Sequence, residues 1–136
     1  MKSNVITKAQ VLDAISDVNA LKLFDAIAND GEESSLEKLK MTRKQYYTRL
    51  AKLVKTGLVK RQKRKYTITS FGKVVYNIHL TFYKAIENSW KFKAIDAMIE
   101  KNELSAEEYQ KALDLLLDKD SDRFKQILFN TSTRSN

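Results

Sequence analysis

The sequence predicts a mainly α-helical fold with one short β-hairpin in its middle third. Pairs typical of helix starts, a Ser or Thr followed three positions later by Glu or Gln, recur along the chain. The apolar period shortens from about 3.6 residues to two only around residues 58–69. With 136 residues, 43% of them hydrophobic, the chain is long enough for one modest core. We therefore expect one core with appended terminal helices.

Three short helices are expected before the middle third of the chain. The first covers about residues 8–16 and begins at Thr7. Asp17 can cap the second, which ends at the turn formed by residues 29–31, and Ser34 begins a third. The apolar residues that these helices should bury are Val18, Leu21, Leu23, Phe24, Ile27, Ala28, Leu36 and Leu39.

A longer, strongly basic helix is expected next. Thr42 with Gln45 predicts its start, and Gly57 is a natural C-terminal cap. The residues predicted to face the core are Tyr46, Leu50, Leu53 and Val54. The opposite side presents Arg43, Lys44, Tyr47, Thr48, Lys52 and Lys55, with Arg49 at the boundary. This polar face contains no acidic residue.

A basic β-hairpin follows Gly57. Residues 58–61 and 66–69 have the period-two pattern of strands, and the polar segment 62–65 separates them. No Asn-Gly or Asp-Gly pair marks the turn, so the register and the turn type stay open.

The last part of the chain is expected to be helical. Ser70 can cap a long helix with an apolar stripe that continues toward Ile99, with or without a break near Asn88-Ser89. The stripe consists of Phe71, Val74, Val75, Ile78, Phe82, Ile86 and Trp90, then Phe92, Ile95, Met98 and Ile99. Ser105 begins another helix, and a final short one precedes a polar tail from Asn130 that should fray. We expect a domain over residues 1–90 and a helical extension over 91–136.

Charge is distributed very unevenly along the chain. Between Lys38 and Ile86 there are fourteen Lys and Arg residues and no Asp or Glu. The remaining 11 basic and 17 acidic residues sum to −6, and the whole chain to +8. A folded basic segment of this kind favours a polyanionic partner, most often nucleic acid.

Composition also argues against several classes of protein. There is no Cys, and His79 is the one His, so no thiolate site or histidine cluster for a metal can form. No catalytic pairing or phosphate-binding glycine loop is visible, and we expect no enzyme activity, cofactor or metal. Acidic groups such as Glu107-Glu108 are typical of helix ends. Lacking an apolar leader or membrane span, the protein is expected to be soluble and cytoplasmic.

Two separated motifs resemble a known family. They are the run from Leu39 to Leu50 continued by Lys52-Leu53 and Thr56-Gly57-Leu58-Val59, and the later run Tyr66-Thr67-Ile68-Thr69-Ser70-Phe71-Gly72-Lys73. Over residues 17–90 the chain resembles winged helix-turn-helix transcriptional regulators of the ArsR and MarR groups, archaeal type. The resemblance implies a winged helix-turn-helix with additional N- and C-terminal helices, a recognition helix in the major groove, and a wing against the DNA backbone or minor groove.

Carried over position by position, the resemblance implies a set of DNA-binding residues. Those of the helix are Arg43, Lys44, Tyr47, Thr48, Arg49 and Lys52, and those of the wing are Lys63, Arg64 and Lys65. The wing is only a few residues long, which departs from the family pattern and favours contact with one phosphate track.

These observations predict a sequence-specific regulator that binds double-stranded DNA as a homodimer. The apolar helix expected over residues 71–99 would form the dimer interface, joined by the first helix. Alternatively, the C-terminal helices over 105–129 fold back and cover the stripe within a monomer. Two other functions stay open: a protein-interaction module, and non-specific coating of chromatin or RNA. The sequence does not specify an effector.

Overall fold

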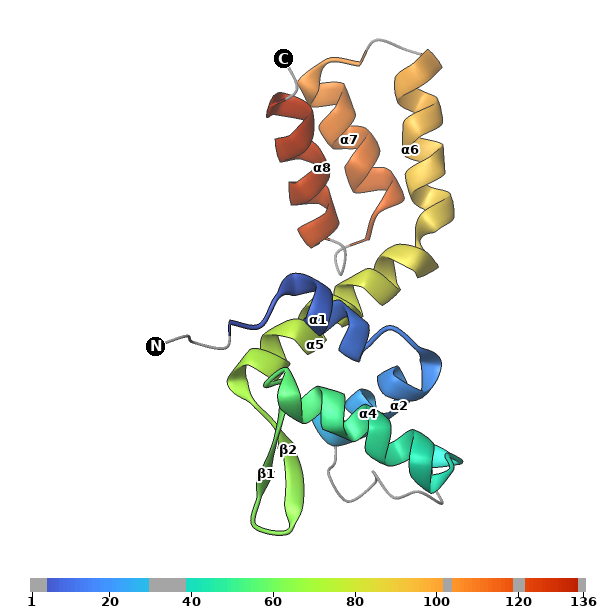
Figure 1. Cartoon of the computed structure of the whole chain (residues 1–136). Helices are drawn as coiled ribbons and strands as arrows, with labels where there is room; N and C mark the ends of the chain where they lie inside the picture. The colour runs from blue at the N-terminus through green and yellow to red at the C-terminus, as the bar shows by residue number, and fades with distance from the viewer. Residues whose placement is uncertain (1–4, 30–38, 102–103, 119–121, 135–136) are drawn as a thin grey trace. The chain divides into compact units, whose positions relative to one another are not determined.

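The computed structural model describes residues 5–29, 39–101, 104–118 and 122–134 (Figure 1). These residues form seven α-helices and one two-stranded antiparallel hairpin, so the prediction of a mainly helical chain with a small hairpin is confirmed. The chain divides into two compact units, residues 1–81 and 82–136. The boundary between them lies earlier in the chain than the expected boundary after residue 90. The expectation of one core is wrong, because each unit has its own hydrophobic cluster.

The first unit begins with two helices whose starts the sequence predicts. Helix α1 covers Lys8–Ala14, and Thr7 forms a capping box with Gln10. Helix α2 covers Val18–Asn29, and the Asp17 carboxylate accepts a hydrogen bond of 2.7 Å from the backbone N–H of Ala20. The helix expected from Ser34 lies outside the described residues.

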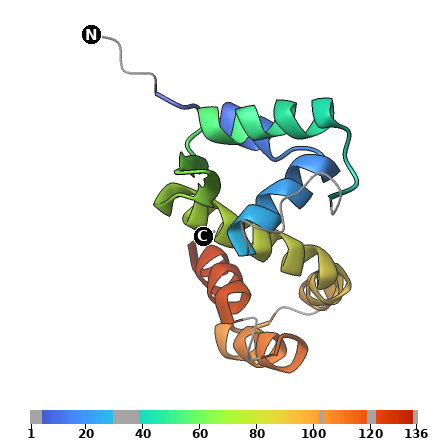
Figure 2. The same cartoon turned by 90° about the horizontal axis from the view of Figure 1, so that it is seen from below.

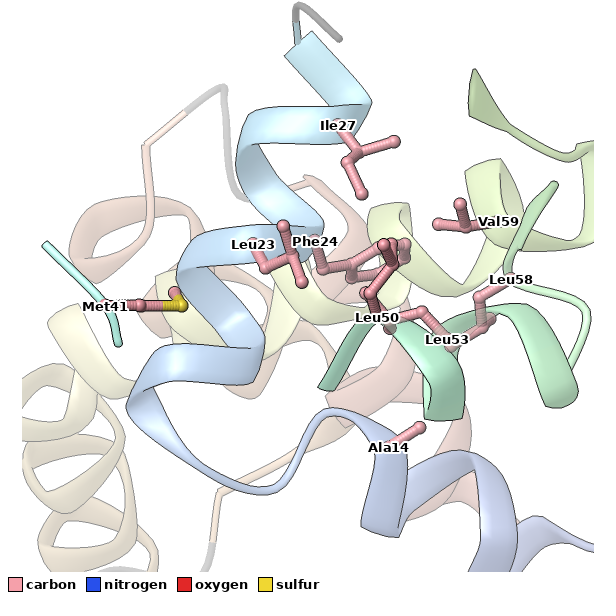
Figure 3. Close-up of a cluster of buried hydrophobic side chains, with 9 residues drawn as sticks. All are labelled: Ala14, Leu23, Phe24, Ile27, Met41, Leu50, Leu53, Leu58 and Val59. Carbon is pink, nitrogen blue, oxygen red and sulfur yellow. The ribbon is translucent and has the colours of Figure 1, made fainter. Parts of the chain in front are cut away.

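The core of the first unit lies between α2 and the basic helix α4, Arg43–Lys55 (Figure 3). Leu23, Phe24 and Leu53 have no exposed surface, and full burial of such a side chain stabilises a fold by roughly 1.5–3 kcal/mol. The buried cluster consists of Ala14, Leu23, Phe24, Ile27, Met41, Leu50, Leu53, Leu58 and Val59. One side of α4 is therefore committed to this core.

An ion pair also holds α4 against the start of α2. The Arg49 guanidinium donates from Nε and Nη2 to the two carboxylate oxygens of Asp17, at 3.2 and 2.9 Å. The hydrogen bond from Arg49 and then that from the Ala20 amide hold the pKa of Asp17 below the ordinary value of an aspartate. Asp17 thus serves both as a helix cap and as the partner of a residue on α4.

Helix α4 ends in a Schellman motif. Gly57 has φ of 81°, and its N–H donates to the Val54 carbonyl at 3.0 Å, while the Leu58 N–H donates to the Leu53 carbonyl at 3.1 Å. The side chains of Leu53 and Leu58 are both fully buried. The predicted glycine cap is confirmed, and it starts the chain on its path into the hairpin.

The hairpin consists of β1, Val59–Gln62, and β2, Lys65–Ile68. Val59 pairs with Ile68 and Gln62 with Lys65, so the turn has two residues, Lys63 and Arg64. Lys63 has φ of 60° and Arg64 does not have a positive φ, which is the pattern of a type II′ turn, where Gly is usual at the first position. This structure decides the register and turn that the sequence left open.

A junction between hairpin and helix follows β2. The Thr69 N–H donates to the Leu58 carbonyl at 3.1 Å, and the Thr69 hydroxyl accepts from the Gly72 N–H at 2.9 Å. Thr69 is thus the residue that caps helix α5, Ser70–Glu87, and the prediction that Ser70 does so is wrong. A Cβ on Gly72 would lie 2.0 Å from the Leu58 carbonyl oxygen, so only glycine allows this approach.

Polar contacts also join α5 to α2 within the first unit. The Tyr76 hydroxyl donates to Asp25 and accepts a hydrogen bond of 3.1 Å from the Asn29 amide. The Tyr76 ring packs edge-on against Phe24, with centroids 5.5 Å apart. Burial, followed by the hydrogen bond to Asp25, raises the pKa of Tyr76 above the ordinary value of a tyrosine.

The second unit contains helices α6, Ser89–Lys101, α7, Ala106–Leu116, and α8, Asp122–Arg134. Helix α7 packs against both α6 and α8 and lies beside α8 in Figure 1 and Figure 2. The core of the second unit consists of Ile95, Tyr109, Leu113, Leu117 and Phe124, and the partly buried Phe92 packs against it. The expectation of a frayed tail from Asn130 is wrong, because α8 continues to Arg134.

The long helix predicted over residues 71–99 is broken at Asn88, between α5 and α6. The C-terminal helices cover Phe92 and Ile95 of the predicted stripe, so that part serves the core of the second unit. None of the helices in the described ranges is long and apolar enough to span a membrane.

The Asp17–Arg49 pair makes a pH-dependent contribution to stability. An Asp17→Asn variant keeps a capping side chain but loses the charge, and we expect it to be less stable than the wild type at pH 7 by about 0.2–1 kcal/mol. Because the folded-state pKa is lowered, the stabilisation is present above the unfolded pKa, about 4, and is lost as the pH falls through the folded value. Urea unfolding from pH 7 to 3 measures it, and a gap that stays constant contradicts it.

Gly57, after the end of α4, and Gly72, in the first turn of α5, should respond differently to Ala. We expect Gly72→Ala to destabilise by about 3 kcal/mol, since the new Cβ would meet backbone. In Gly57→Ala the new Cβ has no other atom near it, so we expect only the destabilisation from a left-handed backbone conformation, roughly 1–2 kcal/mol. Denaturant midpoints followed by circular dichroism test this order. A Gly72→Ala variant as stable as the Gly57→Ala variant contradicts the close packing at Leu58.

Candidate nucleic-acid interface

Helix α4 is positioned at both its ends and along its inner side. At its start the Thr42 hydroxyl accepts from the Gln45 N–H at 3.1 Å, and the Gln45 side chain accepts from the Thr42 N–H at 3.0 Å. Leu50 and Leu53 are buried on the inner side, and Tyr46 packs against the same cluster. The opposite side of the helix is consequently held out toward solvent.

The outer face of α4 consists of Lys44, Thr48, Ala51 and Lys55. These residues recur at spacings of four, three and four, which puts them on one side of the helix, and all of them are exposed. Ala51 is not among the residues predicted from the sequence, although its spacing of three from Thr48 and four from Lys55 places it on this side of the helix. The outer face has cations at both ends and small side chains in the middle.

Two further predicted residues lie beside the outer face. Arg43 is exposed at the first turn of α4, and Tyr47 is 55% exposed, with its ring edge-on to Tyr46 at 5.0 Å. The prediction that Val54 faces the core is wrong, because it is 40% exposed on the same side of the helix. The buried face of α4 is therefore narrower than its apolar pattern indicates.

Two of the residues predicted to bind DNA, Arg49 and Lys52, form ion pairs with acidic residues of the protein. Besides its bonds to Asp17, Arg49 donates from Nη1 to the Gln45 carbonyl at 3.3 Å, so all three of its nitrogens have protein partners. The Lys52 ammonium lies 3.0 Å from the Asp13 carboxylate, and both side chains are about half-exposed. An exposed pair of this kind contributes little to stability, so Lys52 can exchange this partner for a phosphate, whereas Arg49 is held in place.

The hairpin extends the basic surface beyond α4. At its tip Lys63 and Arg64 form the two-residue turn and are exposed, as is Lys65 at the start of β2. All three predicted wing residues therefore lie together. The sequence analysis did not single out Lys60 and Arg61, which are also exposed on β1.

The two faces of the hairpin differ. One face packs toward the core and consists of Val59, Arg61, Tyr66 and Ile68. On this face the Arg61 guanidinium lies 6.0 Å from the centroid of the Tyr66 ring. The other face presents Lys60, Gln62, Lys65 and Thr67. A shallow hollow at the hairpin tip is lined by Gln62, Lys63, Arg64, Lys65 and Thr67.

Among the described residues, Asp13 and Asp17 are the carboxylates that pair with cations of α4. The segment from Lys38 to Ile86 carries fourteen positive charges, and Asp13 and Asp17, which reach α4, are already paired with Lys52 and Arg49. Among the described residues no carboxylate forms an ion pair with Arg43, Lys44 or Lys55. Such a surface can attract a polyanion and neutralise several of its phosphates at once.

His79 does not belong to this surface. It is half-buried on α5, and its ring centroid lies 5.8 Å from that of Tyr76. Over residues 5–29, 39–101, 104–118 and 122–134 no group of three or more His, Asp or Glu side chains is arranged to hold a metal ion.

Comparison with known proteins adds no family to this geometry. No protein-family model, no curated protein and no solved structure matches the chain.

Proposed function

We propose that the first unit is a winged helix-turn-helix that binds double-stranded DNA, with α4 in the major groove and the β1–β2 hairpin as the wing. The observation that carries this proposal is the exposed outer face of α4, which is free of acidic residues and flanked by the basic hairpin. An α-helix fits the major groove of B-form DNA, where base edges are accessible to its side chains. An acidic protein would match the charge but would not need a helical face with small residues at its middle.

The charges of α4 and the hairpin have separate places in this proposal. Lys44 and Lys55 lie about three helical turns apart at the two ends of the outer face, where they can reach phosphates on either side of the groove. Lys63 and Arg64 at the hairpin tip contact a neighbouring phosphate track. Thr48 and Ala51 then lie against the base edges between these anchors.

We further propose that the protein acts as a transcriptional regulator and binds as a homodimer. In the first unit the outer side of α5 exposes Phe71, Val74 and Ile78, and in the second unit Phe82, Ile86 and Trp90 are exposed. Each of these six is between 47% and 66% exposed. Single exposed apolar side chains are ordinary, but a group of them on one side of a helix, such as Phe71, Val74 and Ile78 on α5, is typical of an interface.

A second copy of this chain is the partner that suits these apolar residues. Phe71, Val74 and Ile78 lie on one side of α5 in the first unit, at spacings of three and four, and each is about half-exposed. A stable interface buries about 800 Å² per partner, so further residues around them would take part. None of these three residues is charged, so two copies of this side of α5 can pack on one another about a two-fold axis without like-charge repulsion between them. The bound DNA would then have two half-sites related by the same symmetry, about 10 base pairs apart or a multiple of that.

Loss of one phosphate contact has a defined signature in the salt dependence of binding. We expect Lys44→Ala, Lys55→Ala, Lys63→Ala and Arg64→Ala each to weaken binding to a duplex. Each change should also lower the slope of log affinity against log salt by about one. Fluorescence anisotropy at several salt concentrations measures both quantities for the full chain.

The matched control is Lys93→Ala, which removes the same charge from an exposed position on α6. It should leave the slope unchanged. If all five variants lower affinity equally, binding follows total charge and the protein is a non-specific nucleic-acid coat. If the wild type binds no duplex even at low salt, the basic surface has a protein partner instead.

Dimerisation can be tested by placing a charge on the exposed side of α5. We expect the wild type to sediment as a dimer at micromolar concentration and Ile78→Glu to sediment as a monomer, because the change buries an unpaired carboxylate in the interface. Leu115→Glu is the control, since Leu115 is 86% exposed on α7 and should tolerate the same change. A wild-type monomer mass at every concentration contradicts the dimer.

A further inference from the structure

The outer part of α4 offers few of the groups that read guanine, adenine or cytosine. Bidentate Arg or Lys pairs with guanine, amides pair with adenine, and carboxylates accept a hydrogen bond from cytosine. Helix α4 contains no Asn, Asp or Glu. Its single amide, Gln45, is engaged in the capping box with Thr42. Helix α4 therefore has no carboxylate to recognise cytosine and no uncommitted amide to recognise adenine.

Guanine readout is restricted to the start of the helix. Three of the five N–H groups of Arg49 donate to Asp17 and to the Gln45 carbonyl, so this guanidinium is directed toward the start of α2 and not toward a base. Arg43 and Lys44 in the first turn are the remaining donors on the N-terminal half of α4. Beyond that turn, the middle of the helix has no free fork of hydrogen-bond donors.

Methyl groups occupy this middle. Thr48 and Ala51 are exposed, lie three residues apart on the outer face, and are flanked by Lys44 and Lys55 at spacings of four. Thymine is the base that presents a methyl group in the major groove, and small apolar groups such as those of Ala and Thr contact it. The short Ala51 side chain also allows the helix backbone to approach the bases closely.

We infer that Thr48 and Ala51 read thymine methyl groups, so that the preferred duplex has thymines at the middle of the α4 contact. This inference rests on the proposed DNA binding and adds the chemistry by which a sequence is selected.

Replacement of thymine by uracil removes only the methyl group and tests the inference directly. A preferred duplex is first selected from a random pool with the full chain, and each of its thymines is then replaced singly by uracil. We expect about a fourfold loss of affinity at each contacted position, since burial of one methyl-sized group is worth about 0.8 kcal/mol and tenfold in affinity is about 1.4 kcal/mol. Replacement of the same base pair by one with 5-methylcytosine should restore part of the methyl contact.

Protein variants connect the effect to the two residues. Thr48→Ser keeps the hydroxyl and loses the methyl, and Ala51→Gly loses its only side-chain carbon. In each variant the uracil penalty at one position should fall toward onefold. Ala97→Gly, at an exposed position in α6, lowers helix propensity equally and should keep the full penalty.

The outcomes separate this inference from the function on which it rests. Duplex binding with no uracil penalty at any position overturns methyl readout and leaves DNA binding intact. A penalty that is the same in wild type, Thr48→Ser and Ala51→Gly assigns the contact to other residues and also overturns it. Absence of binding to any duplex overturns both proposals together.

Discussion

The approach of α5 to the Leu58 carbonyl is the constraint on which the rest of the first unit depends. This carbonyl oxygen accepts the Thr69 N–H, and the backbone of Gly72 lies so close to it that a Cβ would not fit. Leu58 itself follows the Schellman end of α4. One short stretch therefore sets where α4 ends, where β1 leaves and where α5 begins. The hairpin is held beside the basic helix because its base is fastened to that helix, although the hairpin has only two strands.

Acidic residues outside the basic segment divide the cations of α4 into two groups. Asp17 pairs with Arg49 and Asp13 pairs with Lys52, so Arg49 and Lys52 help to orient α4. Lys44 and Lys55 on the outer face have no such partner among the described carboxylates. Arg49 donates to three protein acceptors and is directed away from a ligand, whereas the exposed Lys52 can exchange its carboxylate partner for another anion. The ion pairs also leave the small residues Thr48 and Ala51 as the middle of the exposed surface.

Each unit contains a small core, and exposed apolar side chains remain on both. Five residues form the buried cluster of the second unit, which accounts for Phe92 and Ile95 of the apolar stripe but leaves Trp90 exposed. In the first unit Val75 and Tyr76 pack on the core from α5, while Phe71, Val74 and Ile78 do not. A helix with two apolar sides has more apolar surface than one small core can cover, and association is the usual means of covering the remainder.

The sequence by itself determined the features that depend on neighbours within four residues. Capping boxes at Thr7 and Thr42, the glycine end of α4 and the change of period into the hairpin are local, so backbone geometry makes them readable. Only the tertiary structure decided that Asp17 engages Arg49, 32 residues away, and that Val54 is exposed. It also decided that Thr69 rather than Ser70 caps α5, because the Thr69 N–H bonds to the carbonyl of Leu58, which precedes the hairpin. It also decided that two cores form. Periodicity marks a face as apolar or basic, but which atoms meet that face depends on packing between segments distant in the chain.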